Sequence, residues 1–267
     1  MTAEITKKRY AEYLHRLTAV AGTDNLASVE AMIKAVEGLK RADGASLIPT
    51  TKRNFYIALA HATKATAPIA HAAYKKKYEA INKAVKEDKT AKPAAKSWTD
   101  LQLKAGKFVA DESEPLGNRI LIGLLFGDAP GRLDYNNLLI HPDMTDHAGN
   151  YIHLAKTAGE SHLVIQEHKT KKTYGTLYRS ITPATFALLK LWQRDTPGEP
   201  LFKMSENNLG RFITRLLERI TGEHLSINDL RHAYVTEMRK GDMSKHDVEE
   251  ITDKMGHSLT TNYLYRR

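Results

Sequence analysis

Residues 228–232 read Asn228-Asp229-Leu230-Arg231-His232, at the start of a segment, residues 227–239, whose apolar spacing predicts a helix. Three other short segments are also rich in basic, aromatic or glycine residues. In chain order they are residues 129–135 (APGRLDY), 168–175 (HKTKKTYG) and 255–258 (MGHS). Arg132 of residues 129–135 and Arg231 of residues 228–232 are 99 residues apart, so only a folded domain can bring them together. These four segments, with their intervening elements, decide the fold that we predict.

The elements around the four segments are mixed. Short apolar runs separated by Gly, Asp and Asn predict strands at residues 138–140, 151–154, 162–166 and 178–181. Residues 117–126 predict a buried helix, and Thr182-Pro183 predicts the start of another that runs through Trp192. Further helices are predicted at residues 210–220, 227–239 and 247–255. The second part of the chain is therefore predicted to be mainly helical, with a small antiparallel sheet.

The first part of the chain shows only helical periodicity. Helices are predicted over residues 5–21 and 26–39, then from Pro49 and from Pro68, where proline suits the first helical turn. The polar stretch at residues 86–96 predicts an exposed linker; a basic tail of the fourth helix is the alternative. We therefore expect a helical domain at residues 1–92, a linker at 93–100 and a second domain at 101–267.

Composition excludes several classes of protein. The chain has 267 residues, 42% of them apolar and 27% charged, which suits a folded globular protein. It has no cysteine, which excludes disulfides, thiolate metal sites and thiol nucleophiles. No apolar run is long enough to span a membrane, and the first residues lack the apolar core of a secretory signal. We expect an intracellular protein without a membrane partner.

Charge is concentrated in the first part. Residues 1–100 hold 18 basic and 10 acidic side chains, a net charge of +8, whereas residues 101–267 hold 22 and 21, a net charge of +1. A basic module beside a near-neutral one favours a polyanion partner that the first binds and the second acts on.

Motifs for other chemistries are missing. The sequence has no glycine-rich phosphate loop, no HExxH metal motif and no GxSxG nucleophile elbow. His141 and His147 flank Asp143 and Asp146 in a predicted turn. A solvated turn is the interpretation we favour there over a metal site, and we predict no metal and no cofactor.

The four segments together resemble the tyrosine recombinase (phage-integrase) superfamily. Residues 228–232 are similar to its His-x-x-Arg box, and residues 255–258 with Tyr265 to its Leu-Gly-His-Ser…Tyr box. The form of residues 130–135 and 169–175 is similar to the branch found in large DNA viruses and eukaryotic mobile elements. The resemblance covers residues 97–267, and the N-terminal bundle resembles the family's core-binding domain only in position and character. It implies breaking and rejoining of DNA through a 3′-phosphotyrosyl bond, without metal or ATP.

The resemblance assigns a role to each candidate. Arg132 and Arg231 would hold the non-bridging phosphate oxygens, for which two guanidinium groups are chemically suited in the absence of a metal. Lys169, before Thr170, would protonate the leaving 5′ oxygen as general acid, with Lys171 and Lys172 as alternatives. The candidate catalytic residues also include His257, Asn228 and Tyr265. Of these, His257 would stabilise the charged transition state.

Two tyrosines compete for the role of nucleophile. Tyr265 lies eight residues after His257 and Tyr263 only six, and the family usually places the nucleophile about nine residues after the histidine. The ending Tyr-Arg-Arg also resembles the family's last residues, so we assign the role to Tyr265.

Asn228 departs from the family, which usually has histidine at this position. Asparagine can donate a hydrogen bond to phosphate but cannot exchange protons at neutral pH. Asn228 could instead cap the helix that carries Arg231. For Arg231, the alternative is a surface ion pair with Asp229 or Glu237.

The predicted partner is double-stranded DNA, bound by a homo-tetramer on synapsed sites. Basic side chains expected to contact phosphates are Arg53, Lys75, Lys76, Lys77, Lys171 and Lys172. The sequence ends two residues after Tyr265, where many family members continue into a helix that docks on a neighbouring subunit. We therefore expect assembly through other surfaces, a missing tail, or looser coupling between subunits.

Two alternatives remain open. A type IB topoisomerase would use the same residues as a monomer, and the short tail favours it. A DNA-binding protein that keeps the fold without catalysis is supported by Asn228.

Overall fold

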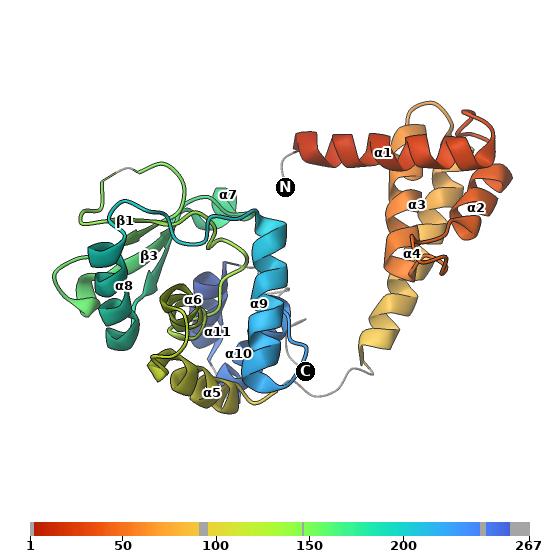
Figure 1. Ribbon diagram of the computed structural model, residues 1–267. Coiled ribbons are helices and arrows are strands. Elements are labelled where there is room, and N and C mark those ends of the chain that lie inside the picture. Colours follow the sequence, from red (N-terminus) through yellow and green to blue (C-terminus); the bar gives the residue numbers. More distant parts are fainter. Residues whose placement is uncertain (1–2, 91–95, 146, 241–243, 257–267) are drawn as a thin grey trace. The chain divides into compact units, whose positions relative to one another are not determined.

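The computed structural model describes residues 3–90, 96–145, 147–240 and 244–256. The chain divides into two compact units, residues 1–93 and 94–267 (Figure 1). Within the described residues, no helix combines the length and the apolar character that a membrane crossing requires.

The first unit is built from helices alone. Its helices are α1 (Ala3–Ala21), α2 (Val29–Gly38), α3 (Pro49–Thr63) and α4 (Pro68–Thr90). α4 continues through residues 86–90, so our prediction of a linker there was wrong and the alternative of a helical tail was right for these residues. The reason is that Lys86, Glu87 and Lys89 are good helix formers, and the first proline after them is Pro93.

Apolar packing and the hydroxyl of Tyr74 hold the first unit together. Leu17, Phe55 and Leu59 are completely or almost completely buried, as the predicted helical periodicity requires. Tyr74 of α4 is fully buried, and its hydroxyl donates to the carbonyl of Leu26 at 2.7 Å. Such a bond removes the cost of burying the phenol oxygen, because a buried polar group needs a partner.

The second unit combines helices with a four-stranded sheet. Its helices are α5 (Trp98–Ala110), α6 (Leu116–Phe126), η1 (Ala158–Glu160), α7 (Lys171–Tyr174), α8 (Pro183–Asp195), α9 (Glu206–Thr221), α10 (Ile227–Met238) and α11 (Lys245–Met255). Its strands are β1 (Leu139–His141), β2 (Tyr151–His153), β3 (His162–Ile165) and β4 (Leu177–Ser180). The fold class is thus mainly helical with a small sheet, as predicted.

The sheet is mixed, which corrects the prediction of an antiparallel sheet. The strand order is β1-β2-β3-β4; β2–β3 and β3–β4 are antiparallel, but β1 pairs with β2 in parallel. β1 has only three residues, a length of roughly 10 Å. The loop of residues 142–150 is long enough to return the chain to the start of such a short strand, so β2 runs in the same direction.

Two helix boundaries show what the sequence analysis missed. α5 was not predicted and begins at Trp98, inside the range expected to be linker, where Ser97 caps it by accepting from the amide of Asp100. Trp98 is almost fully buried and stacks on Phe126 at a ring separation of 5.1 Å, so α5 belongs to the core of the second unit. α9 begins at Glu206, four residues earlier than predicted, because Ser205 caps it.

Candidate functional site

The guanidinium of Arg231 joins its own segment to two of the other three. Its Nη1 donates to the carbonyl of Pro130 at 2.8 Å, and its Nη2 donates to the carbonyl of Met255 at 3.1 Å. The side chain is completely buried. Pro130 lies two residues before Arg132, and Met255 two residues before His257. One buried arginine therefore joins Pro130 of the first segment, its own segment and Met255 at the end of α11.

The start of α10 places Arg231 inward. Ser226 and Asp229 form a reciprocal capping box, in which Ser226 Oγ accepts from the Asp229 amide and the Asp229 carboxylate accepts from the Ser226 amide. Asn228 is exposed in the first turn, so the expectation that it caps the helix was wrong. The expected surface ion pair of Arg231 was also wrong, because its side chain is buried.

The segment of Arg132 is held by its own tyrosine. The amide of Gly131 donates to the hydroxyl of the fully buried Tyr135 at 3.0 Å. A Cβ on residue 131 would lie only 2.7 Å from that hydroxyl, so glycine is required there. Arg132 itself is half-buried, and within the described residues its side chain makes no hydrogen bond or ion pair.

The fourth segment lies between the antiparallel strands β3 and β4, in the loop of residues 166–176. Thr170 Oγ1 donates to the carbonyl of Gly256 at 2.8 Å, which joins this loop to the end of α11. Lys169, Lys171 and Lys172 are all exposed. Lys171 is paired with Glu167 at 2.8 Å, whereas in the described part of the chain Lys169 and Lys172 have no such partner.

The end of α11 is held by a second arginine that the sequence analysis did not select. Arg179 of β4 is 4% exposed, and its Nη2 donates to the carbonyl of Lys254 at 3.2 Å. Arg179 and Arg231 thus bind successive carbonyls in the last turn of α11, where a helix leaves carbonyls without partners. Gly256 follows with φ of 59° and ends the helix in the left-handed conformation. His257, Tyr263 and Tyr265 lie outside the described residues.

Charge at this site is partly buried. Burial raises the pKa of the Asp134 carboxyl above its ordinary value, and the nearby cationic groups of Arg179, His168 and Arg132 oppose that rise. Two arginines thus lie near the Asp134 carboxyl, and two buried nitrogens of Arg179, Nε and Nη1, have no hydrogen-bond partner in the described structure. Such an environment suits an anionic group.

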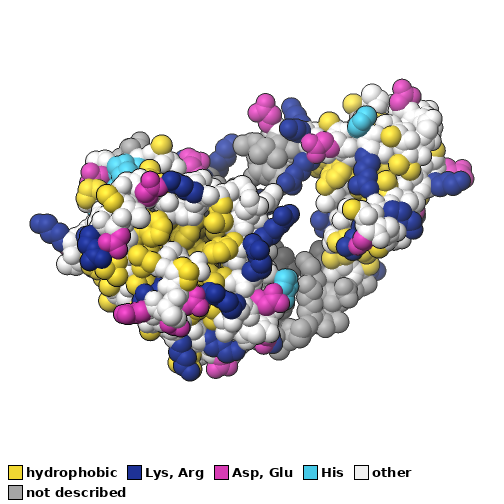
Figure 2. Space-filling view, viewed as in Figure 1, with side chains coloured by type: hydrophobic (Ala, Val, Ile, Leu, Met, Phe, Trp, Pro, Cys, Tyr) yellow, Lys and Arg dark blue, Asp and Glu magenta, His cyan; other side chains and the backbone are white. Residues whose placement is uncertain are grey.

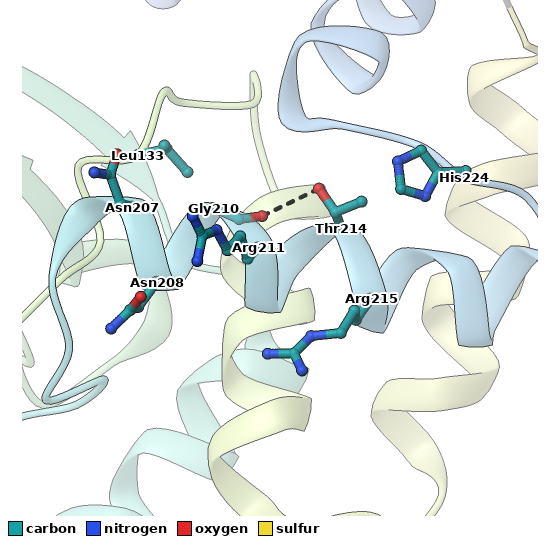
Figure 3. A pocket seen from close by; sticks show the side chains of 8 residues that line it. All are labelled: Leu133, Asn207, Asn208, Gly210, Arg211, Thr214, Arg215 and His224. Atoms are coloured by element: carbon teal, nitrogen blue, oxygen red, sulfur yellow. Dashed lines mark hydrogen bonds between the residues drawn. The ribbon is translucent and has the colours of Figure 1, made fainter. Parts of the chain in front are cut away.

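An open pocket of about 770 Å³ lies beside the Arg132 segment (Figure 3). Leu133 forms part of its wall and packs against Gly210, where an added Cβ would lie 3.1 Å from Leu133 Cδ1. The other lining residues are polar or basic: Asn207, Asn208, Arg211, Thr214, Arg215 and His224. This polar surface could have been predicted from the amphipathic pattern of α9. The opposite face of the helix carries the buried Leu209, Ile213, Leu216 and Leu217.

The basic residues predicted to bind DNA in the first unit differ in their surroundings. Arg53 is half-buried, and its guanidinium donates to Asn82 at 3.3 Å and to Asn54 at 3.5 Å. Lys75, Lys76 and Lys77 are exposed on α4, and Lys75 lies 3.9 Å from Glu79. On the face drawn in Figure 2, lysine and arginine side chains project into solvent from both units.

The histidine turn of the second unit is closed by internal contacts. The rings of His141 and His147 stack at 3.5 Å, and His147 Nε2 lies 2.8 Å from Asp143 Oδ1. Within the described residues, no group of three or more His, Asp or Glu side chains is arranged to hold a metal ion; Asp146 lies outside them.

No family model and no curated protein matches the sequence. Among solved structures, the whole chain is similar to 81% of a chain in a lambda integrase dimer bound to a COC′ core site, with 16% identity and a TM-score of 0.44. It is similar in the same way to 78% of a chain in a lambda integrase tetramer bound to a Holliday junction, with 18% identity and a TM-score of 0.43. Similarities this weak carry no functional argument, so the functional assignment depends on the contacts among the four segments.

Proposed function

We propose that the protein is a DNA strand transferase of the tyrosine recombinase type, which breaks and rejoins DNA at specific sites. The observation that carries the proposal is the pair of bonds from Arg231 to the carbonyls of Pro130 and Met255. Together with the bond from Thr170 to Gly256, they join the backbones of all four segments on which the family resemblance was recognised. A chance match of short motifs would not be expected to converge in this way.

The chemistry begins with the phosphate. Arg132, half-exposed and without a side-chain partner in the described structure, binds a non-bridging oxygen of the scissile phosphate. Arg231 holds the surrounding backbone and adds its positive charge beneath the phosphate. Asn228, exposed in the first turn of the same helix, donates a hydrogen bond, and His257 donates another. These groups stabilise the charge that develops on the phosphoryl oxygens in the transition state.

The covalent step exchanges one phosphodiester for another. The Tyr265 hydroxyl releases its proton to water as its oxygen attacks the phosphorus and forms the 3′-phosphotyrosyl bond. The bond from phosphorus to the 5′ oxygen breaks, and Lys169 gives its proton to that oxygen. Rejoining is the reverse reaction with a 5′ hydroxyl of a second strand. Because the phosphoester energy is retained in the tyrosyl bond, no ATP is consumed, and the arginines perform the charge stabilisation that a metal would otherwise supply.

DNA binding is assigned to two basic surfaces. In the second unit, Arg211 and Arg215 of the α9 pocket lie beside the Arg132 segment and suit contacts to phosphates and base edges. In the first unit, Lys75, Lys76 and Lys77 of α4 are exposed and suit contacts to phosphates. Arg53 is the weakest of our candidates, because two asparagines already accept from its guanidinium. Site-specific recombination further requires that four copies assemble on two duplexes.

The experiment traps the covalent complex. The protein is incubated with a library of random duplexes, the reaction is stopped with detergent, and the DNA that remains bound is sequenced. A nicked duplex of the recovered sequence then serves as a suicide substrate, because the short cleaved strand diffuses away and prevents rejoining. We expect the parent chain to form an adduct in EDTA, Tyr265→Phe to form none, and Tyr263→Phe to retain it.

Each other result changes the assignment. An adduct that survives in Tyr265→Phe and disappears in Tyr263→Phe moves the nucleophile to Tyr263. Loss of the adduct in EDTA, restored by a divalent ion, contradicts the metal-free mechanism. Relaxation of a plasmid without recombinant products supports the topoisomerase, and binding without any adduct supports the non-catalytic alternative.

A further inference from the structure

We propose that Asn150 is a positioning residue that sets the Lys169 loop against the Arg132 segment. It thereby places the general acid relative to the phosphate. This inference depends on the proposed function, because it assigns the geometry of one of its steps. Asn150 belongs to none of the four segments, and it directly precedes β2.

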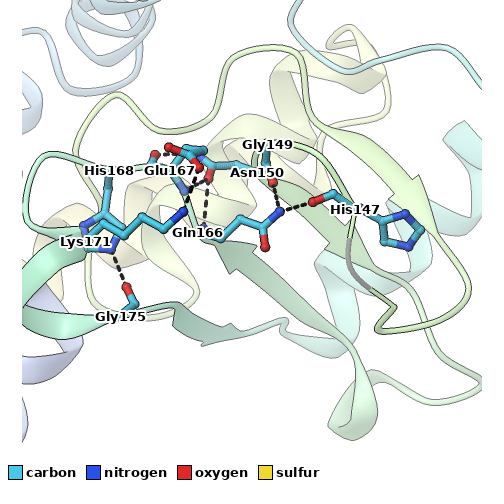
Figure 4. A network of polar contacts seen from close by, with 8 residues as sticks. All are labelled: His147, Gly149, Asn150, Gln166, Glu167, His168, Lys171 and Gly175. Atoms are coloured by element: carbon cyan, nitrogen blue, oxygen red, sulfur yellow. Dashed lines mark hydrogen bonds and ion pairs between the residues drawn. The ribbon is translucent and has the colours of Figure 1, made fainter. Parts of the chain in front are cut away.

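All the hydrogen-bonding capacity of the Asn150 amide is used. Figure 4 shows Asn150 beside Gln166 and Glu167. Its Nδ2 donates to the carbonyls of Asp134 at 3.1 Å and Glu167 at 3.0 Å. Its Oδ1 accepts from the amides of Gln166 at 3.0 Å and Glu167 at 2.7 Å. A side-chain amide offers two donors and two acceptor lone pairs, so these four bonds saturate it.

The four bonds connect two catalytic segments that no strand joins. Asp134 lies two residues after Arg132, and Glu167 lies two residues before Lys169. The pairing of β3 with β4 ends at Ile165 and Leu177, so the loop that carries Lys169 has left the strand ladder. The Asn150 side chain takes the place of a strand partner for the first two residues of that loop.

Other contacts stiffen the same loop. The Gln166 side chain donates to the carbonyl of Gly149 at 2.6 Å and also to that of His147. His168 Nε2 contacts the carbonyl of Gly175 at 2.7 Å, across the base of the loop. Thr170 is bound to Gly256, as described above. Lys169 therefore lies between a neighbour fixed through Asn150 and a neighbour fixed to the end of α11.

This arrangement matters for rate because proton transfer requires close and directed approach. An error of about 1 Å in the placement of a reacting group can cost roughly 100-fold in rate. Asn150 does not itself touch the reacting atoms in this scheme. It acts through the backbone on the position of Lys169 relative to Arg132.

A sulfur substitution separates this role from a general structural one. In a substrate with sulfur in place of the scissile 5′ oxygen, the leaving group is a thiolate. A thiol has a pKa of roughly 8.5, far below that of an alcohol, so the thiolate leaves without a proton from Lys169. We measure the rate of adduct formation on the oxygen and the sulfur forms of the trapped DNA sequence.

On the oxygen substrate, we expect Lys169→Ala to lose on the order of 100-fold and Asn150→Ala at least about tenfold. On the sulfur substrate, both variants should approach the parent rate. Asn150→Asp keeps the acceptor oxygen but places a carboxylate oxygen against the carbonyls of Asp134 and Glu167 in place of both donated bonds, so we expect the same selective loss. Thr145→Ala is the matched control, because Thr145 lies in the 142–150 loop with Asn150 and its side chain binds, among the described residues, only Asp143 and His147.

The outcomes are separable. The inference is overturned if both Asn150 variants form the adduct as slowly on the sulfur substrate as on the oxygen substrate. It is also overturned if both form it as fast as the parent on the oxygen substrate, because Asn150 then does not position the general acid. If the parent forms no adduct on either substrate, the proposed function itself fails, and the inference fails with it.

Discussion

The contacts inside the first unit differ in kind from the contacts inside the second. In the first unit, apolar helix faces meet, and bonds such as Tyr74 to Leu26 join one helix to the segment beside another. In the second unit, Arg231, Thr170 and Arg179 donate to carbonyls that are 101, 86 and 75 residues away along the chain. Those carbonyls lie in loops and at a helix end. A bundle needs only matching apolar faces, whereas a site made from loops needs side chains that hold the loops.

The placement of positive charge differs in the same sense. Lys75, Lys76 and Lys77 of the first unit are exposed to solvent, where charge gives salt-dependent attraction to a polyanion. Arg179 and Arg231 of the second unit are buried against backbone carbonyls. There a charge strengthens hydrogen bonds and fixes geometry. The first arrangement suits binding and the second suits positioning.

The largest effect that tests this contrast is expected from Arg231→Ala. The change leaves the buried carbonyls of Pro130 and Met255 without their partner, which costs about 3 kcal/mol or more in the free energy of unfolding. Both tryptophans, Trp98 and Trp192, lie in the second unit, so tryptophan fluorescence during denaturation reports that unit alone. We expect an earlier fluorescence transition and no covalent adduct.

Arg219→Ala is the control for Arg231→Ala, because Arg219 is exposed and pairs with Glu114 at 2.6 Å. The Arg219 side chain is about half exposed and also lies over the Phe108 ring at 5.2 Å, so we expect this variant to lose only about 1 kcal/mol and to keep the adduct. If Arg231→Ala unfolds at the same denaturant concentration as Arg219→Ala, the buried arginine does not hold the second unit together.

The next largest effect is expected from Arg132→Ala, and it distinguishes a residue that contacts phosphate from one that holds the fold. The Arg132 side chain makes no hydrogen bond or ion pair in the described residues, so Arg132→Ala should leave the fluorescence transition within about 0.5 kcal/mol of the parent. It should nevertheless slow adduct formation by about 100-fold or more, as loss of a charged transition-state contact does. Asn228→Ala should cost less activity than either arginine change, because it removes a neutral donor.

Rates of adduct formation under single-turnover conditions provide the measurement for these variants. An equal loss in Asn228→Ala and Arg132→Ala would make Asn228 a full member of the site. A large loss of stability in Arg132→Ala would place this arginine with Arg231 among the residues that hold the fold.

The contrast between the units also explains what the sequence could predict. The bundle helices and α6, α8 and α10 were located closely, because burial imposes a helical period and because Pro49, Pro68 and Pro183 mark helix starts. α5 was missed because the prediction of a linker extended over Trp98 and Asp100. The parallel pairing of β1 and β2 could not be predicted, since strand direction depends on the path of the 142–150 loop and not on any period.

At the site, the sequence identified segments but not the bonds that join them. The boxes containing Arg132, Thr170, Arg231 and Gly256 are joined by contacts to backbone carbonyls, and a carbonyl carries no signal in the sequence. For the same reason Asn150 and Arg179 were not selected. Each lies outside the boxes, and each acts on a carbonyl that is distant along the chain.

The smallest effect concerns Glu37 in the first unit and tests whether the units respond separately. Burial raises the pKa of the Glu37 carboxyl, but hydrogen bonds from Lys52 and Tyr56 and the positive charges of Lys52 and Lys77 outweigh it, so the net pKa lies below the ordinary value. The Tyr56 hydroxyl donates to Glu37 at 2.8 Å, and burial raises the pKa of Tyr56, so this donor remains protonated at neutral pH.

A carboxyl with a lowered pKa in the folded state stabilises that state above its ordinary pKa of 4.5, and the contribution is lost as the pH falls through the lowered value. Because Glu37 is nearly half exposed, solvent screens the interaction, and Glu37→Gln should cost only about 0.5 kcal/mol at pH 7. The difference between parent and variant should shrink as the pH falls below 4.5. Circular dichroism should detect the shift, because the first unit is helical, while tryptophan fluorescence of the second unit stays unchanged. A fluorescence transition that moves with Glu37→Gln would show that the two units unfold together, and the contrast drawn between them would then not extend to their stability.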